Sequence, residues 1–156
     1  MLYFAYGSNM DWNQIRERCP SASFVGIAML RDHRLAFTRK SQKRNCGVAD
    51  AVVDPGHSIW GVVYEVDDRD VGGLDASEGY SPGRGNNDYR REERHVFPDG
   101  DGTKPLAVAV YFATPDSNPP LPNQAYKDQI LAGARWWHLP KVYTSQVLET
   151  IEVAAE

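Results

Sequence analysis

The sequence predicts an α+β fold: a small mixed or antiparallel β-sheet, open or closed into a small barrel, with helices to one side. Several short β-branched and aromatic runs punctuated by turn residues indicate strands. These runs do not alternate regularly with helical segments, as a parallel α/β sheet would require. The chain has 156 residues, of which 42% are hydrophobic and 24% charged, so we expect one globular domain, 1–156.

Turn and capping signals divide the chain into segments. The expected order is strand 2–6, helix 11–18, strands 23–30 and 34–38, strands 48–53 and 59–66, helix 68–77, strands 89–97 and 106–113, and helices 124–137 and 142–151.

The first strand is an apolar and aromatic run that stops at the turn 7–9. The helix that follows can be capped by Asn9 or Asp11, and Pro20 lies just beyond its end. The turn 31–33 separates the next two strands, and the basic segment 41–45 is expected to be an exposed loop.

Two hairpins are expected in the middle of the chain. Asp54-Pro55-Gly56 is a strong turn signal between the β-branched runs 48–53 and 59–66. The glycine-containing segment 98–102 separates the strands of the second hairpin in the same way.

The remaining elements are helical. Asp67 or Asp68 can cap a helix that Gly79 ends. The segment 115–122 carries four prolines and is expected to be a loop. Apolar residues recur at helical spacing within 124–137, and Pro140 begins the last helix.

Composition excludes several classes of protein. A formal net charge of −4 provides no basic field for a nucleic-acid backbone, so we expect a small-molecule ligand and no nucleic acid. The longest apolar run, 106–113, is too short to cross a membrane, and no basic leader begins the chain. We therefore expect a cytoplasmic protein. Cys19 and Cys46 lack zinc-site spacing, and no metal site is expected.

The turn Tyr6-Gly7-Ser8-Asn9 is the first candidate site. A strand, a glycine and polar residues that precede a helix leave backbone N–H groups free to bind an anion or a developing oxyanion. The same pattern also describes an ordinary strand-to-helix turn with Asn9 as its cap, and spacing alone favours that interpretation.

Glu78, within Leu74-Asp75-Ala76-Ser77-Glu78-Gly79, is the second candidate. It falls at the C-terminal end of a predicted helix, where the macrodipole disfavours negative charge. Partial burial there raises the pKa of a carboxyl group and suits it to general acid–base catalysis near neutral pH. A solvated surface glutamate beside a glycine cap is the alternative.

Other polar groups carry weaker signals. The four histidines show no metal spacing and are expected to be surface or packing residues. Cys46 has no identifiable partner histidine. The basic residues Arg39, Lys40, Lys43 and Arg44 are expected to be solvated, with contact to an anion as the alternative. Tyr111 lies in an apolar strand, so its hydroxyl needs a buried partner or a ligand. Arg84 is expected to decorate the polar loop 80–88, with contact to a substrate carboxylate as the alternative.

Taken together, these segments resemble the γ-glutamylcyclotransferase family of the AIG2-like superfamily. The resembling segments, in family order, are YFAYGSN at 3–9, GVADAVVD at 47–54, IWGVVYEV at 59–66, LDASEG at 74–79, Tyr89, Tyr111 and the stretch 119–139. They cover nearly the whole chain. The loop 80–88 is longer than the simplest family pattern.

The resemblance implies a barrel-like α+β domain with one cavity, which forms 5-oxoproline from γ-glutamyl compounds without metal or organic cofactor. It implies that Glu78 is the general acid/base, that the backbone amides of Tyr6, Gly7, Ser8 and Asn9 bind substrate, and that Tyr111 lines the pocket. The amides would hold either the carbonyl oxygen or the α-carboxylate.

The implied chemistry agrees with the residues. The α-amine of the substrate attacks its own γ-carbonyl, so no protein nucleophile is needed, and ring closure requires mainly orientation. The leaving group stays open among an amino acid, an amine, a peptide such as glutathione and a biosynthetic intermediate, as does the choice between monomer and homodimer. The alternative hypothesis is a non-catalytic module that binds a γ-glutamyl or other small acidic ligand.

Overall fold

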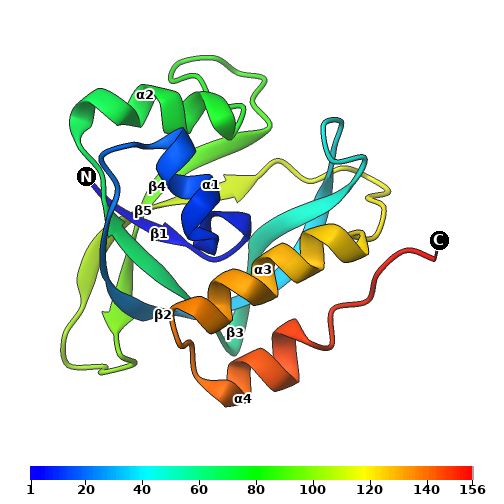
Figure 1. The fold of residues 1–156 in the computed structure, drawn as a ribbon. Helices are drawn as coiled ribbons and strands as arrows, with labels where there is room; N and C mark the ends of the chain where they lie inside the picture. Colours follow the sequence, from blue (N-terminus) through cyan, green and yellow to red (C-terminus); the bar gives the residue numbers. More distant parts are fainter. Residues whose placement is uncertain (156) are drawn as a thin grey trace.

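Five strands close into a barrel in a computed structural model that describes residues 1–155 (Figure 1). The strands are β1 (Leu2–Ala5), β2 (Ser23–Ser41), β3 (Cys46–Glu65), β4 (Tyr89–Pro98) and β5 (Leu106–Ala113). Their order around the barrel is β1-β3-β2-β4-β5. Neighbouring strands are antiparallel except β1 and β5, which pair in parallel at Tyr3 and Ala109 and close the barrel. The predicted mixed sheet and its barrel form are confirmed.

The long strands β2 and β3 correct two predictions. The expected separate strands 23–30 and 34–38 form one strand, which continues through Asp32 at a φ of 60°. The expected hairpin at Asp54-Pro55-Gly56 is wrong, because β3 also continues through these residues and pairs with β2 on both sides of them. Four residues of β3 (54–57) lie opposite the single residue Asp32. The turn signal therefore marks a bulge in a bent two-stranded ribbon.

The actual connection between these strands is the short turn 42–45. The second predicted hairpin is confirmed, since β4 and β5 pair from Tyr89 opposite Ala113 to Val96 opposite Leu106.

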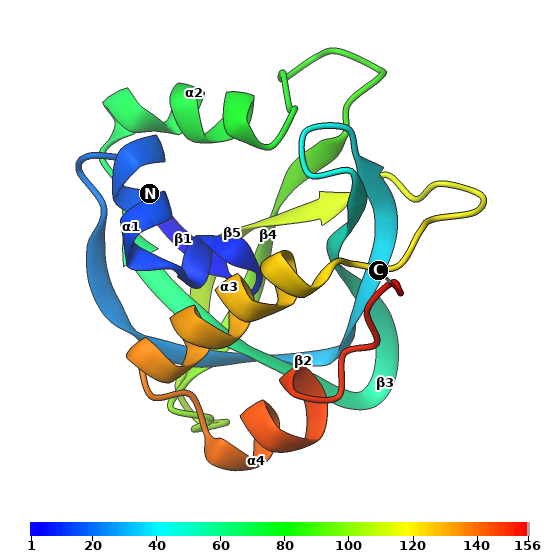
Figure 2. The same ribbon diagram turned by 45° about the vertical axis from the view of Figure 1, so that its right-hand side comes forward.

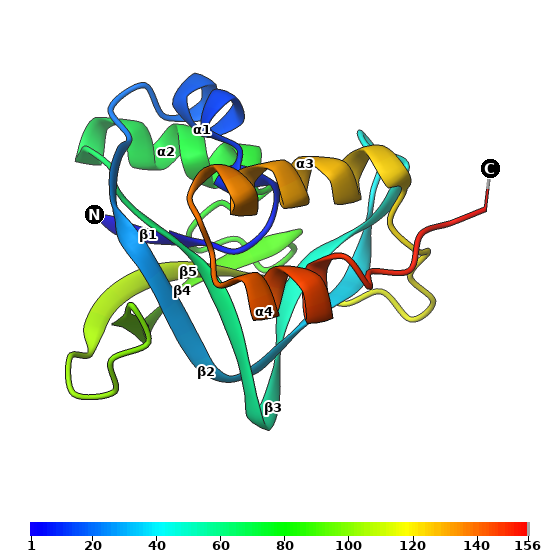
Figure 3. The same cartoon turned by 60° about the horizontal axis from the view of Figure 1, so that its bottom comes forward.

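The helices lie close to their predicted positions. They are η1 (Ser8–Met10), α1 (Trp12–Arg18), α2 (Asp68–Ser77), α3 (Gln124–Trp136), α4 (Lys141–Tyr143) and η2 (Thr144–Leu148). Asp11 caps α1 by accepting a hydrogen bond from the backbone of Asn13. The last predicted helix, 142–151, is shorter than expected and ends at Leu148 in a π-helical turn. Figures 2 and 3 show α1, α2 and α3 gathered over one end of the barrel, with α4 beside β3.

Helix α3 packs backbone to backbone against η1. A Cβ atom at Gly133 would lie 2.5 Å from the carbonyl carbon of Met10 and 2.7 Å from the amide of Asp11. Trp137 donates from Nε1 to the Met10 carbonyl at 2.9 Å, and Tyr64 donates to the Asn9 carbonyl at 2.9 Å. The turn after β1 is therefore held from two sides.

The interior is apolar and continuous from the barrel to α3. Phe4, Ile59, Val62, Val110 and Ile130 are fully buried. Cys19 and Cys46 are buried as free thiols. Within residues 1–155, none of the helices has the length and apolar character needed to span a lipid bilayer.

Candidate functional site

A cavity of about 450 Å³ opens at the end of the barrel that the helices cover. Its walls come from segments far apart in the chain: the end of β1 with η1, the end of α1, the tip of the β2–β3 ribbon, the end of α2, and β5. All six residues named from the sequence line it: Tyr6, Gly7, Ser8, Asn9, Glu78 and Tyr111. The fold thus brings together the two candidate sites, which lie about 70 residues apart.

Glu78 is the C-terminal cap of α2, and its carboxyl group is partly buried at the cavity. Burial raises the pKa of Glu78 to about 7, because removal from water disfavours the charged form. Arg18 and Arg44 oppose this rise, and Asp75 adds to it. A carboxyl group with such a pKa exchanges its proton readily at neutral pH.

Asn9 connects the turn after β1 to Glu78. Its side chain is buried, and Nδ2 donates to the Tyr3 hydroxyl at 2.9 Å and to Glu78 Oε1 at 3.2 Å. Its Oδ1 accepts from Gln14 Nε2 at 2.9 Å and from Arg18 Nη1 at 3.0 Å. The Asn9 side chain therefore faces the carboxyl group, whereas the resemblance concerned its backbone amide.

The turn after β1 has backbone N–H groups that are free to bind a ligand. Ser8 accepts a hydrogen bond at Oγ from Gln14, and the Tyr6 hydroxyl donates to the Tyr111 carbonyl at 2.5 Å. Across residues 1–155, the backbone N–H groups of Gly7, Ser8 and Asn9 have no hydrogen-bond acceptor. Because Gly7, Ser8 and Asn9 line the cavity, these N–H groups are candidate donors to a ligand.

Tyr111 lines the cavity, and its hydroxyl has the buried partner that the sequence requires. It donates to Asp75 Oδ1 at 2.5 Å. Arg91 donates to both carboxylate oxygens of Asp75 at 2.6 Å. Burial and the neighbouring Asp75 carboxylate raise the pKa of Tyr111, so it stays a neutral donor.

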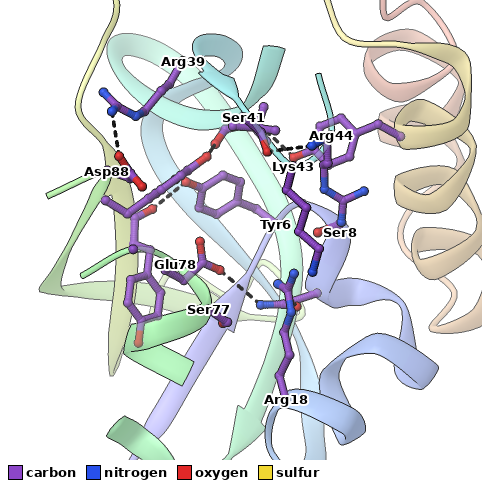
Figure 4. A pocket seen from close by; sticks show the side chains of 18 of the residues that line it. Tyr6, Ser8, Arg18, Arg39, Ser41, Lys43, Arg44, Ser77, Glu78 and Asp88 are labelled. Carbon is purple, nitrogen blue, oxygen red and sulfur yellow. Dashed lines mark hydrogen bonds and ion pairs between the residues drawn. The ribbon is translucent and has the colours of Figure 1, made fainter. Parts of the chain in front are cut away.

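The basic residues 39–44 line the cavity. Lys43 is exposed, as expected, but the ribbon bends so that its tip borders the cavity. Figure 4 shows Lys43 and Arg44 across the cavity from Glu78. Arg44 lies 4.7 Å from the centre of the Tyr126 ring and donates to Gln14 and Gln129.

Arg18, at the end of α1, adds a further cation to the cavity wall. Arg39 differs from the other basic residues because it pairs with Asp88 at 2.6 Å and Asp116 at 3.5 Å. The basic residues 39–44 were expected to be solvated, with anion contact as the less favoured alternative, so their place at the cavity is a correction. The available signal was their density: four of the 17 lysines and arginines lie within 39–44 of an acidic chain.

The loop 80–88 closes on itself. Arg84 donates to Asn87 and to the Gly79 carbonyl, as expected of a residue that decorates the loop. Only its end, Asp88, reaches the cavity.

Comparisons with known proteins point to one family. Residues 3–137 match the family model described as gamma-glutamyl cyclotransferase, AIG2-like. The gamma-glutamylcyclotransferases of Homo sapiens and Mus musculus are each 34% identical over 155 residues, which cover 97% of this chain and 78% of theirs.

Solved structures give the same result. A gamma-glutamyl cyclotransferase structure superposes with a TM-score of 0.88 at 32% identity, over 100% of this chain and 90% of that one. YkqA from Bacillus subtilis, at 23% identity, shares the fold with a TM-score of 0.76 over 99% of this chain and 56% of its own. The chain belongs to the AIG2-like γ-glutamyl cyclotransferase family.

Proposed function

We propose that the protein is a γ-glutamylcyclotransferase that converts a γ-glutamyl compound to 5-oxoproline and a free amine, with Glu78 as general acid and base. The observation that carries the proposal is the Glu78 carboxyl group, which faces a cavity and has a pKa of about 7. Family membership supports the reaction class.

The reaction needs two proton transfers and no protein nucleophile. Glu78 accepts a proton from the α-nitrogen of the substrate as that nitrogen bonds to the γ-carbonyl carbon. It then donates the proton to the leaving nitrogen as the original amide bond breaks. One carboxyl group returns to its starting state, and the atoms of the substrate are divided between the two products. A pKa near neutrality lets the same group serve both steps.

The donors around the cavity suit an anionic substrate. The free amides of Gly7, Ser8 and Asn9 can bind a carboxylate or stabilise the charge that develops on the carbonyl oxygen. Arg18 and Arg44 face Glu78 closely enough to lower its pKa, so they also lie within electrostatic reach of a substrate bound beside it. The amide donors and these cations therefore favour binding of the substrate α-carboxylate.

We further infer that the leaving group carries a carboxylate. The cations exceed what a single α-carboxylate requires, and within residues 1–155 neither Lys40 nor Lys43 forms an ion pair. Both line the cavity. A γ-glutamyl amino acid or peptide satisfies this charge better than a γ-glutamyl amine.

The test is detection of 5-oxoproline by mass spectrometry. Wild type, Glu78→Gln and the control Glu93→Gln, an exposed glutamate of β4, are incubated with γ-glutamyl amino acids, γ-glutamyl amines and glutathione. We expect product from wild type and the control, and a loss of about 10²-fold or more in Glu78→Gln. Binding without product across the panel would instead indicate a non-catalytic binding module.

One substrate pair isolates the leaving-group carboxylate. γ-Glutamylalanine and γ-glutamylethylamide differ only by that group. We expect wild type to prefer the first, and Lys43→Gln to reduce the preference by raising KM for γ-glutamylalanine alone. Lys104→Gln, in the distant β4–β5 connection, is the matched control. Equal kcat/KM for the two substrates in wild type would contradict the inference.

A further inference from the structure

The Asn9 amide has one possible orientation. Its Oδ1 accepts from Gln14 Nε2 and from Arg18 Nη1, and an arginine can only donate. The orientation of Gln14 is fixed in turn, because Arg44 donates to Gln14 Oε1 at 2.9 Å. Two arginines, from α1 and from the turn after β2, therefore determine which end of each amide is the donor.

It follows that Asn9 always presents an N–H group to Glu78. Nδ2 lies 3.2 Å from Glu78 Oε1 and 2.9 Å from the Tyr3 hydroxyl. A flip of the side-chain amide would place its oxygen against the Glu78 carboxylate and its nitrogen against the Arg18 guanidinium, and both contacts are repulsive. The backbone beside it is also held, because the Tyr64 hydroxyl donates to the Asn9 carbonyl.

The two oxygens of Glu78 are therefore not equivalent. Oε1 receives the Asn9 hydrogen bond, whereas Oε2 has no hydrogen-bond partner among residues 1–155. Glu78 borders the cavity, so Oε2 is the oxygen left for a ligand (Figure 4).

We propose that Asn9 is a positioning residue that keeps Oε1 of Glu78 as an acceptor and leaves Oε2 as the single oxygen that takes up and releases the proton. This inference rests on the proposed function. In the reaction, Oε2 receives the proton from the attacking α-nitrogen and returns it to the leaving nitrogen. Both nitrogens are bonded to the same carbon in the tetrahedral intermediate, so one fixed oxygen can serve both without rotation of the carboxyl group.

A second consequence concerns the charge of Glu78. A hydrogen bond donated to a carboxylate favours the ionised form. From the 3.2 Å contact of Asn9 Nδ2 with Glu78 Oε1 we expect Asn9 to oppose the burial that raises the pKa of Glu78, and so to help keep the basic form populated at neutral pH. The other ionisable groups around the carboxyl group are Arg18 on α1, Arg44 after β2, Asp75 on α2 and the tyrosines at 3, 6, 89, 111 and 126.

The test is direct titration of the Glu78 carboxyl by carbon-13 NMR, with its signal identified by its absence in Glu78→Gln. Asn9→Ala removes the donor and is expected to raise the midpoint by about one pH unit or more. Asn9→Asp keeps the size of the side chain but places a second carboxylate against Oε1, so we expect a larger rise. Asn13→Ala, the same change at an exposed position of α1, should leave the midpoint in place.

Kinetics provide the second measurement. The rising limb of kcat/KM against pH should move with the NMR midpoint in both Asn9 variants, and kcat at the new optimum should fall. A merely structural role for Asn9 would lower activity and melting temperature without moving either midpoint. An unchanged midpoint in a folded Asn9→Asp variant overturns the inference.

The two proposals fail in different ways. The titration needs no substrate, so the Asn9 effect can be measured even if wild type forms no 5-oxoproline. Product formation together with an unmoved midpoint would overturn the role of Asn9 alone. A moved midpoint without product would overturn the proposed function and, with it, the assignment of the transferred proton to Oε2.

Discussion

Tyr111 of β5 donates a 2.5 Å hydrogen bond to Asp75 of α2, one helical turn before Glu78. Asp75 is buried, and Arg91 of β4 completes its set of partners at 2.6 Å. A buried carboxylate therefore joins α2 to two strands of the barrel. The position of Glu78 depends on this connection, because Asp75 lies in the last turn of α2 and Glu78 caps the same end of the helix.

Removal of each partner of Asp75 should destabilise the protein to a different extent. Arg91→Met leaves the buried carboxylate without its counter-ion, and we expect a loss of about 3 kcal/mol or more. Tyr111→Phe removes one hydrogen bond and should cost about 1–3 kcal/mol. Urea unfolding measures both, with the exposed Arg69→Met as control. Equal losses would show that the ion pair contributes nothing beyond the hydrogen bond.

Glu78 should reduce stability at neutral and alkaline pH. Its pKa in the folded protein is about 7, against an ordinary value of 4.5, so the folded state binds more protons than the unfolded state between these values. Stability conferred by the protonated group is then lost as the pH rises towards 7. We expect Glu78→Gln to be more stable than wild type at pH 8 by up to about 3 kcal/mol, and equally stable near pH 4.

Thermal or urea unfolding of the two proteins across that range measures the difference. A constant gap from pH 4 to pH 8 would contradict the raised pKa. The same variant is expected to lose turnover, so the site would gain activity at the expense of stability.

The pH dependence of the reaction should follow the same group. Glu78 must be ionised in the free enzyme to accept a proton, so kcat/KM should rise with pH and reach half its plateau near pH 7. Initial rates of 5-oxoproline formation between pH 5 and pH 9 provide the profile. A flat profile over this range would exclude Glu78 as the base.

Substitution by alanine should have opposite effects on stability at two helical glycines, Gly72 and Gly133. A Cβ atom added at Gly72 in α2 would have no atom within 4 Å apart from its chain neighbours and the backbone of its own helix, so Gly72→Ala should stabilise the protein by up to about 1 kcal/mol. At Gly133 the added methyl group would overlap the backbone of Met10 and Asp11. Gly133→Ala should therefore lower the melting temperature and weaken activity, because it displaces α3 from the turn that carries Asn9.

Differential scanning calorimetry and 5-oxoproline assays of the two variants provide the comparison. If Gly133→Ala were as stable and active as wild type, the contact between α3 and η1 would not support the site.

Much of the site could be predicted because its signals are local. A strand that ends in Gly7-Ser8-Asn9 and a helix that ends at Glu78 are both visible within a few residues of sequence. The barrel and the family were also correctly predicted. What joins the two segments is a contact between Asn9 and Glu78 across 69 positions, which periodicity and capping rules do not describe.

The missed features depend on tertiary structure in the same way. Arg44 resembles a solvated loop residue until the β2–β3 ribbon bends and places it over Tyr126. Asp54-Pro55-Gly56 was misassigned because the same residues favour a hairpin turn and a bulge. Only the partner strand distinguishes these outcomes, and here β2 continues past the bulge.

That bulge also determines where this protein can tolerate changes in length. Successive side chains of a strand point to opposite faces of the sheet. Deletion of one residue from 54–57 would therefore move the side chains in the first part of β3 to the opposite face, while those in its last part stayed in place. Val48 and Ala49 would leave the cavity wall, and the cations at the ribbon tip would move with them. Insertions in the loop 80–88 or between β4 and β5 carry no such penalty. Natural variants of this chain should therefore differ in length at those loops and keep the spacing between Val53 and Ser58 constant.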